Sequence, residues 1–403
     1  MATISMQALN SAPRPRAYGG PAFLSGGFRP FFLFGALWSA LALPLWLAAY
    51  IHGYALGGAL PAMLWHAHEM IYGYAVAAVT GFVLTAVPNW TGRLPLRGMP
   101  LAALVGLWLA GRIAMLTSGI IGPAPAAAID LALLPVLIFV VVRELHAARN
   151  FHNLPVAGTL ALLFAGNVLV HLQALGVAYT AALGNRIGVA TLVALISLIG
   201  GRIVPSFTRN WLAKMRPDVH APAPHDRVDS VCLLFVVAAL VAWVAAPDAR
   251  VSSLLALGGS AAAALRLGRW RGLATVREPL LFVLHVGYAW VAIGLALLGV
   301  NGLVALLPPG APLHALTVGA VGTMTLAVMT RASLGHSGRA LTAGPGTVLI
   351  YGLVSLAALL RIAVPLAGSQ MAIVTSLAGV AWMAAFALFA ALYAPIFFDR
   401  KQS

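Results

Sequence analysis

The chain has 403 residues, of which 61% are hydrophobic and only 8% are charged. Soluble domains are about a quarter charged, so this composition excludes a water-soluble globular protein. In a soluble protein a formal charge of +15 would indicate nucleic-acid binding, but basic loops on one side of a membrane explain it here, and no nucleic-acid partner is expected. The single cysteine, Cys232, excludes an intramolecular disulfide and a cysteine-based metal cluster.

Long apolar stretches predict an all-α, polytopic transmembrane helical bundle. A bilayer core of about 30 Å requires about 20 helical residues, and these stretches do not alternate as the strands of a membrane barrel would. We expect about twelve spans, near 32–51, 64–87, 101–118, 126–142, 155–176, 187–204, 229–246, 251–265, 280–299, 313–330, 347–366 and 371–394. The eighth of these is the weakest.

Basic residues in the predicted loops are distributed asymmetrically. Almost all of them fall on the side that carries both chain ends, and only Arg186 and Arg250 fall on the other. The positive-inside rule therefore predicts cytoplasmic termini, with the lipid bilayer as the main partner. We expect a cytoplasmic tail over residues 1–27, one transmembrane domain over 28–398 and a second tail over 399–403.

The second span begins with two histidines and a glutamate, at Trp65-His-Ala-His-Glu69. Residues 66 and 68 are about 200° apart on a regular helix, so their side chains should face opposite ways. Glu69 follows His66 by three residues and is expected on the same face, as a metal ligand or as a partner of one.

Four histidines are predicted at the outer, non-cytoplasmic mouth of the bundle: His66, His68, His171 and His314. Arg112 and Arg361 lie at similar depth, and an arginine there needs an anionic partner, such as Glu69 or a ligand carboxylate. Histidines and arginines in one layer suit a haem whose propionates face outward, and imidazole also suits copper. Hydrogen bonding of each histidine to backbone carbonyls is the simpler interpretation of any one of them alone.

The remaining histidines have simpler interpretations. His52 lies in the first outer loop and could join the outer group, whereas His285 is expected to be a structural hydrogen-bonding residue near Tyr288. His336 is placed in a tight inner turn. Four further histidines are assigned to solvated inner loops: His146, His152, His220 and His225.

Several segments together resemble the NnrS family of membrane proteins. They are Phe28-Arg-Pro-Phe-Phe32, Trp65-His-Ala-His-Glu-Met70 with Gly81-Phe-Val-Leu-Thr-Ala-Val-Pro-Asn-Trp-Thr-Gly92, Gly166-Asn-Val-Leu-Val-His171, Gly201-Arg-Ile-Val-Pro-Ser-Phe-Thr208, and His314-Ala-Leu-Thr-Val-Gly-Ala-Val-Gly-Thr-Met-Thr325. The resemblance implies a haem- and copper-containing inner-membrane protein linked to nitric oxide metabolism and nitrosative-stress resistance. It implies no defined turnover, so enzyme activity is left open, as is a homo-oligomer.

A looser resemblance is to subunit I of haem–copper oxidases, which also has twelve helices with haem-ligating histidines on the second and tenth. His314 paired with His66 or His68 fits that layout, but helices six and seven of this chain contain no histidine, so a binuclear centre is not expected. The cofactors expected from the resemblance and from the outer histidines are b-type haem and copper, with nitric oxide as a small ligand. A transporter of copper or another small solute is the alternative, and a cofactor-poor assembly or sensing protein is the third hypothesis.

Overall fold

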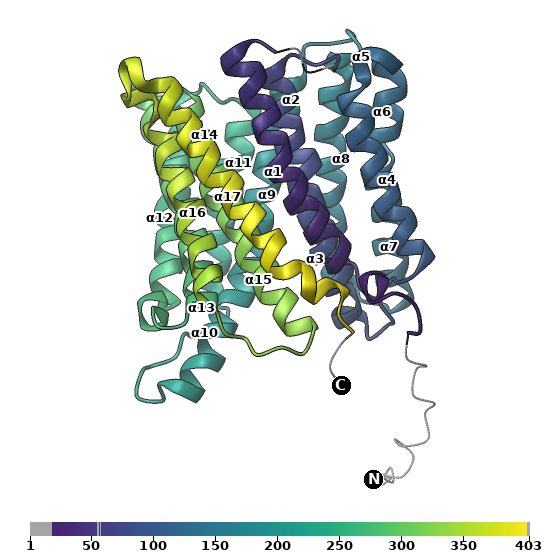
Figure 1. Cartoon of the computed structure of the whole chain (residues 1–403). Coiled ribbons are helices and arrows are strands. Elements are labelled where there is room, and N and C mark those ends of the chain that lie inside the picture. The colour runs from purple at the N-terminus through teal and green to yellow at the C-terminus, as the bar shows by residue number, and fades with distance from the viewer. Residues whose placement is uncertain (1–17, 55, 57, 401–403) are drawn as a thin grey trace.

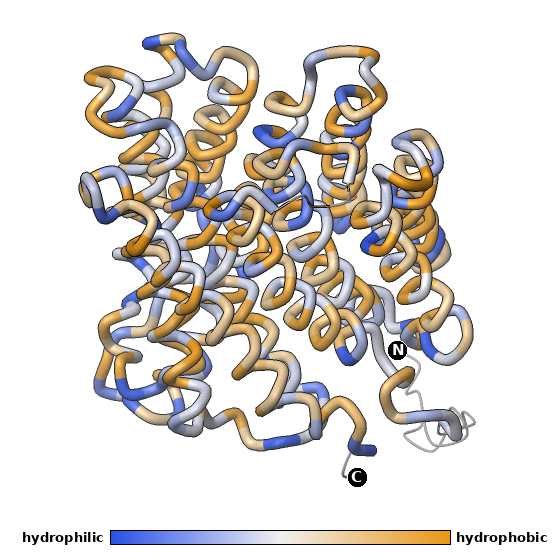
Figure 2. The backbone as a smooth tube through the Cα atoms, turned by 45° about the horizontal axis from the view of Figure 1, so that its top comes forward, coloured by the Kyte–Doolittle hydropathy of each residue, from blue (hydrophilic) through white to orange (hydrophobic). Residues whose placement is uncertain are grey.

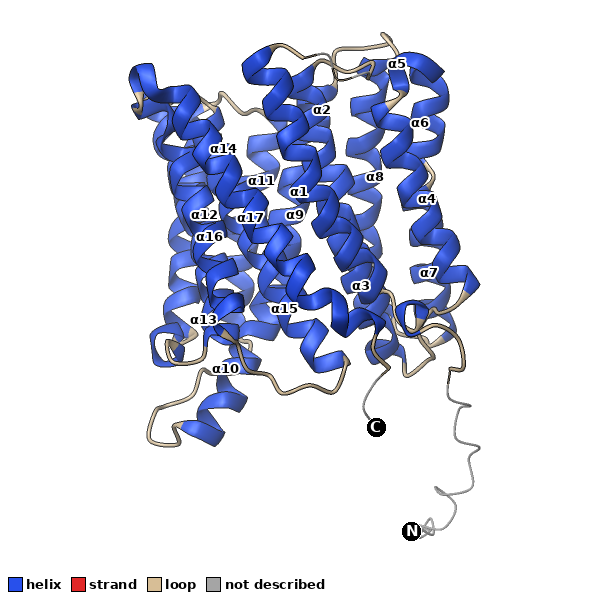
Figure 3. Ribbon diagram, in the orientation of Figure 1, coloured by secondary structure: helices blue, strands red, loops and turns tan. Residues whose placement is uncertain are grey.

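The computed structural model describes residues 18–54, 56 and 58–400, and these form helices without any strand (Figure 3). Within this part of the chain, twelve helical stretches are long and apolar enough to cross a membrane, which confirms the predicted fold class and number of spans. The eighth span, predicted to be the weakest, is the helix α12 (Arg250–Arg269). The chain is therefore a multi-pass membrane protein.

Several spans are built from more than one helical element. In chain order the spans are α1 (Phe28–His52); α2 (Ala62–His68), η3 (Glu69–Ala75) and α3 (Val76–Thr91); α4 (Met99–Leu116); α6 (Pro123–Leu131) and α7 (Leu133–Ala147); η4 (Phe151–Asn153) and α8 (Leu154–Ala174); α9 (Ala181–Leu195), η5 (Ile196–Gly200) and α10 (Gly201–Met215); α11 (Arg227–Ala245); α12; α13 (Pro279–Val304); α14 (Gly310–His314), η7 (Ala315–Gly322) and α15 (Thr323–His336); α16 (Pro345–Ala363) and η8 (Val364–Leu366); and η9 (Gly368–Gln370) and α17 (Met371–Phe398). Short helices in the connections are η2 (Ala22–Leu24), α5 (Ser118–Ile121) and η6 (Gly272–Thr275).

Both ends of the described chain lie at the same end of the bundle (Figure 1). The buried Arg29 at the start of α1 donates hydrogen bonds to the carbonyls of Ile396 at 3.0 Å, Phe397 at 2.8 Å and Asp399 at 2.7 Å. These are orphan carbonyls at the end of α17, where a cation also complements the helix dipole. The first and last spans are thus tied together at what we call the terminal end, and the other end is the distal end.

Apolar side chains also cover the outside of the bundle. Phe139 is 64% exposed, Leu234 66% and Val241 61%. Figure 2 shows apolar residues along all of the helices. Such a surface is a liability in water but is the expected surface in contact with lipid tails.

Three spans contain a π-helical stretch: η3 in the second span, η5 in the sixth and η7 in the tenth. A π-helical turn inserts an extra residue, re-aims the side chains around it and is frequent at functional sites. All three stretches contribute residues to cavities inside the bundle. The cofactor-binding residues are therefore best sought between these three spans.

Two helices extend further than the sequence predicts. The sixth span runs over Ala181–Met215 rather than 187–204, so Arg186, predicted in an outer loop, lies inside α9. The tenth span continues to His336, which ends α15 and does not lie in a tight turn. Hydropathy detects only the apolar part of a helix, and the backbone stays helical where more polar residues follow.

Candidate functional site: two groups of histidines on opposite faces of the second span

His66 and His68 point to different parts of the bundle, as the helical spacing predicts. His66 lines a cavity together with His314, whereas His68 is fully buried beside Asp130 and His171. Glu69 lies on the His68 side, because its carboxylate accepts from Arg112 and contacts the His68 ring. The prediction that Glu69 shares the face of His66 is therefore wrong, because Trp38 Nε1 and Arg112 Nη1 donate to the Glu69 carboxylate on the opposite side of the span.

The first group is a network of charged and polar side chains, which we call the buried ion cluster. Its members are Trp38, His68, Glu69, Arg112, Asp130, Asn167 and His171. They come from α1, α2, η3, α4, α6 and α8. All of them are buried. The cluster therefore ties together the first five spans.

Arg112 is the centre of charge in the buried ion cluster. Its Nη1 donates to Glu69 Oε2 at 2.5 Å, and its Nη2 donates to Asp130 Oδ1. Both terminal nitrogens are therefore engaged by protein carboxylates. Glu69 was one of the two partners predicted for Arg112, whereas Asp130 was not predicted. Arg112 Nε is buried without a hydrogen-bond partner, but the charge of the guanidinium is already balanced by protein carboxylates.

Gly73 in η3 allows this close approach. A Cβ atom built at Gly73 would lie 2.6 Å from Arg112 Nη1 and 2.8 Å from Glu69 Oε2. The Gly73 carbonyl also accepts a hydrogen bond from Trp108 Nε1 at 3.0 Å. Any side chain at this position would push Arg112 and Glu69 apart.

The two histidines of the cluster meet at Asp130. The Oδ2 atom of Asp130 lies 3.2 Å from His68 Nε2 and 2.9 Å from His171 Nε2, and the Asn167 amide donates to the same oxygen at 2.8 Å. One donor atom from each of His68, Asp130 and His171 can be chosen so that all lie within 4.8 Å of one another, a spacing that could hold a metal ion. Imidazole nitrogen suits copper, zinc and iron.

The cluster also has a stable arrangement without a metal. Both ring nitrogens of His68 face carboxylates, Nδ1 at 2.8 Å from Glu69 Oε1 and Nε2 at 3.2 Å from Asp130 Oδ2. If His68 carries both ring protons, two cations, His68 and Arg112, balance two carboxylates. Buried charges are tolerated only when paired in this way, so a neutral ion network is the simpler interpretation and metal binding must displace a proton.

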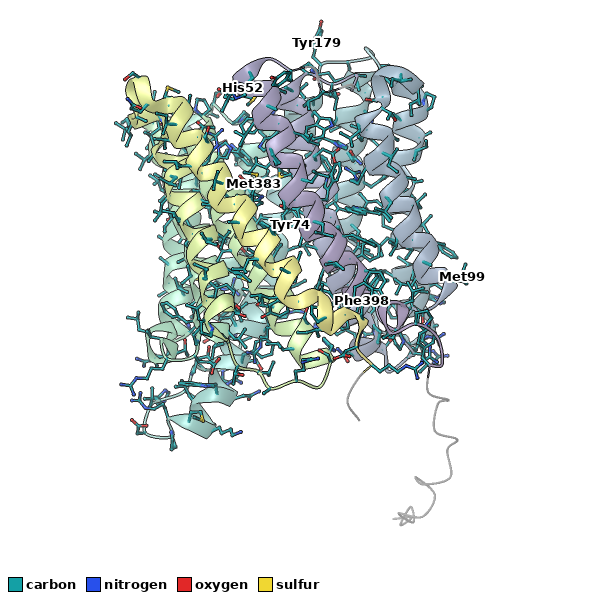
Figure 4. The ribbon with its side chains drawn as sticks, in the orientation of Figure 1. His52, Tyr74, Met99, Tyr179, Met383 and Phe398 are labelled. Carbon is teal, nitrogen blue, oxygen red and sulfur yellow. The ribbon has the colours of Figure 1, made fainter. Side chains whose placement is uncertain are left out.

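The second group surrounds a cavity of about 430 Å³, which we call the distal cavity. Its polar lining includes His66, Asn185, Arg186, His314 and Arg361. These come from the second, sixth, tenth and eleventh spans. The volume falls within the range of about 300–1,000 Å³ found for ligand and cofactor sites. Tyr74, about midway along the bundle (Figure 4), also lines it.

Several polar atoms at the distal cavity have no hydrogen-bond partner. Asn185 Oδ1, Arg186 Nε and His66 Nδ1 are all buried and unpaired. Buried polar groups are normally satisfied, so each exception needs an explanation such as a missing ligand. The distal cavity therefore has the character of a site built for a polar group that the protein alone does not supply.

The geometry of the two cavity histidines suits ligation. His314 Nδ1 lies against the Gly310 carbonyl, which can only accept, so the proton is on Nδ1 and Nε2 is left as a free base. His66 stacks on Trp46 with ring centroids 4.2 Å apart, which fixes the plane of the imidazole. The Arg361 guanidinium lies 5.9 Å from the Trp46 ring centroid, so it flanks the same wall.

The structure thus divides the six residues predicted to bind a cofactor. His66, His314 and Arg361 line the distal cavity, whereas His68, His171 and Arg112 belong to the buried ion cluster. His52 joins neither, because it is exposed at the end of α1 (Figure 4). His285 is a buried hydrogen-bonding residue as predicted, with Nε2 3.0 Å from Thr208 Oγ1.

Sequence reasoning missed two charged residues of these sites, Asp130 and Arg186, and three neutral ones, Trp38, Asn167 and Asn185. Asp130 is a carboxylate inside the apolar part of the fourth span, and a charge at that depth is a functional signal in itself. Arg186 was assigned to a loop because the hydropathy of the sixth span falls off before it. Its role at the distal cavity could be recognised only once the helix was seen to begin at Ala181.

Comparison with known proteins agrees with the resemblance noted in the sequence. The family model described as NnrS protein matches residues 22–401, nearly the whole chain. The chain belongs to the NnrS family. A search of curated proteins finds no significant match. Membership of the NnrS family makes this a membrane protein related to nitric oxide, and it leaves open which residues hold a metal or cofactor.

Proposed function

We propose that this NnrS protein binds haem in the distal cavity and copper at the buried ion cluster, and acts in nitric oxide metabolism and nitrosative-stress resistance. The observation that carries the proposal is the meeting of two histidines and two arginines around one cavity that contains unpaired polar atoms. Haem iron is commonly held by imidazole, and its two carboxylates pair well with arginine. Covalent attachment would need a Cys-x-x-Cys-His motif, so the single Cys232 favours b-type haem.

Each residue of the distal cavity has a role in this proposal. His314 would ligate iron through its free Nε2, and His66, held by Trp46, is the second candidate ligand. Arg186 and Arg361 would pair with the haem carboxylates, since Arg112 is already paired with Glu69 and Asp130. Bound there, haem would supply an iron centre that can bind nitric oxide.

The copper assignment rests on the donor set of His68, Asp130 and His171. Two imidazoles and one carboxylate form a mixed nitrogen and oxygen site that suits copper. Arg112 and Asn167 fix the carboxylate and so orient the ligands, as groups around a metal site usually do.

Transport of copper or another small solute is the alternative. The same histidines could form a transit site, but the middle part of the bundle, next to the distal cavity, is lined almost entirely by apolar side chains. A charged or hydrated ion finds no ligands there, and unpaired charge inside a membrane is costly. This favours a resident cofactor over a transported ion.

The visible spectrum and metal content of the purified protein test the proposal directly. We expect a Soret band and a stoichiometric amount of copper by mass spectrometry of the acid-digested protein. Absence of both from protein that is folded and was expressed with haem and copper available would contradict the proposal. Copper uptake into vesicles without a Soret band would instead favour the transporter.

We also propose that the protein lies in the inner membrane, with both termini in the cytoplasm and the distal end facing the periplasm. The asymmetry of basic loop residues supports this orientation. A reporter fused after the last residue should be active in the cytoplasm, and one inserted in the 305–309 connection should be active in the periplasm. If both reporters give the same compartment, the orientation and the periplasmic position of the distal cavity are wrong.

Replacing Arg186 or Arg361 with leucine should weaken haem retention. Each variant loses one charge-assisted pair with a haem carboxylate, which in a site shielded from water typically contributes about 1.5–3 kcal/mol. The measurement is the fraction of haem transferred to an excess of apomyoglobin over time. Arg250→Leu is the matched control, because Arg250 is an exposed arginine at the start of α12 outside the cavity. Equal haem loss from all three variants would contradict the carboxylate-pairing role.

A further inference from the structure

Three cavities follow one another between the second, sixth and tenth spans. The distal cavity is followed by a middle cavity of about 90 Å³, and that by a cavity of about 490 Å³ toward the terminal end. The middle cavity shares Leu192 and Val321 with the distal cavity. It shares Phe32, Phe82 and Val328 with the terminal-end cavity. The three cavities are therefore neighbours in series.

The middle cavity has almost no polar lining. Thr325 is the one polar side chain among its lining residues, and the rest are apolar or glycine. The Thr325 hydroxyl donates to the Val321 carbonyl at 2.7 Å and also bonds the Tyr74 hydroxyl. A buried water needs two to four polar partners. The middle cavity is only partly enclosed, but with Thr325 already engaged it offers water too few partners and should be dry.

Gly200, the last residue of η5, keeps this space open. A Cβ atom built there would meet only Met324 Cε, at 3.9 Å, which is an ordinary van der Waals contact. The backbone φ of −55° is one that any residue adopts. The glycine is therefore not required by its backbone conformation or by a close neighbour. What a larger side chain at this position would change is the volume of the middle cavity.

We propose that the middle cavity is a binding site for a small, uncharged, apolar molecule of the size of a diatomic gas, and that it links the two larger cavities. A dry cavity with apolar walls stays empty of water and takes up apolar guests such as xenon. Ions are excluded, because no ligands replace their hydration shell. The proposal of a binding site depends only on the size and lining of the middle cavity. Delivery of nitric oxide to haem in the distal cavity rests in addition on the proposed function.

Xenon binding to the full-length protein in detergent tests the binding site without any cofactor. In ¹²⁹Xe NMR, we expect Gly200→Leu to weaken xenon binding about tenfold or more, because leucine fills the middle cavity. Gly200→Ala adds only the Cβ atom, so it should fold normally and show an intermediate effect. Gly106→Leu is the matched control, since Gly106 is an exposed helical glycine in α4 with no atom within 4 Å of a built Cβ. Equal xenon binding by wild type, Gly200→Leu and Gly200→Ala overturns the proposal.

The rate at which nitric oxide rebinds after flash photolysis tests the link on haem-containing protein. We expect about tenfold slower rebinding in Gly200→Leu and an unchanged rate in Gly106→Leu, with identical Soret spectra. An unchanged rate in Gly200→Leu overturns the link. Protein with no Soret band contradicts the proposed haem function instead, and the xenon experiment then still decides on the binding site.

Discussion

Replacing Asp130 with asparagine should be among the most damaging single substitutions in this protein. Asp130 is buried, and its carboxylate is contacted by Arg112, His68, Asn167 and His171. Asparagine has nearly the same shape, so the main change is one missing negative charge beside buried cations. Removing one partner of a buried ion pair typically costs about 3–5 kcal/mol, which should appear as a large fall in the midpoint of thermal unfolding in detergent. Copper content should fall as well, because a proposed ligand is lost.

The exposed pair of Arg216 and Asp218 gives the matched control. Arg216 Nη2 lies 3.2 Å from Asp218 Oδ2, but the Asp218 side chain is 65% exposed. Asp218→Asn should therefore leave the unfolding midpoint nearly unchanged, because solvent screens an exposed pair. In the double variant Arg112→Gln, Asp130→Asn, the charges of the buried ion cluster balance again, and part of the lost stability should return. If Asp130→Asn is no more harmful than Asp218→Asn, the cluster does not depend on charge balance.

The number of spans and their order follow from hydropathy, because each apolar run must cross the membrane once. Hydropathy predicts the ends of helices less well, and this error led to the wrong placement of a residue of the distal cavity. The sixth span begins at Ala181, so Arg186 is a cavity residue rather than a loop residue. Loop-charge counting treated it only as an exception to the positive-inside pattern. A helix that starts with polar residues gives no hydropathy signal at its start, although its side chains can still face the interior.

Depth in the membrane could be predicted from the sequence, but direction around the helix axis could not. Distance from the end of a span placed His66, His68, His171 and His314 near one end of the bundle, and they do lie toward it. Which of them meet depends on how the spans are arranged. The fourth and fifth spans bring Asp130 and His171 to one face of the second span, and the tenth brings His314 to the other. Single-chain periodicity contains no information on that arrangement.

His66 and His68 lie on opposite faces of the second span, so we expect their substitution to affect different cofactors. His66→Ala and His314→Ala should lose haem or change its spectrum to high spin, because each removes a proposed iron ligand, and copper content should stay at the wild-type level. His68→Ala and His171→Ala should lose copper and keep the haem spectrum. The measurements are visible spectra and metal content of the same purified samples.

His220→Ala controls for nonspecific effects in this series, because His220 is exposed in the connection between α10 and α11 and lies in neither site. It should keep both cofactors. Loss of haem and copper together in His68→Ala can result from unfolding of the buried ion cluster, so His68→Gln, which keeps a hydrogen-bonding side chain, is measured in parallel. In that variant the haem spectrum should persist while copper is lost. If His66→Ala depletes copper and leaves haem intact, the assignment of the two cofactors to the two faces is wrong, because the distal cavity would then hold copper.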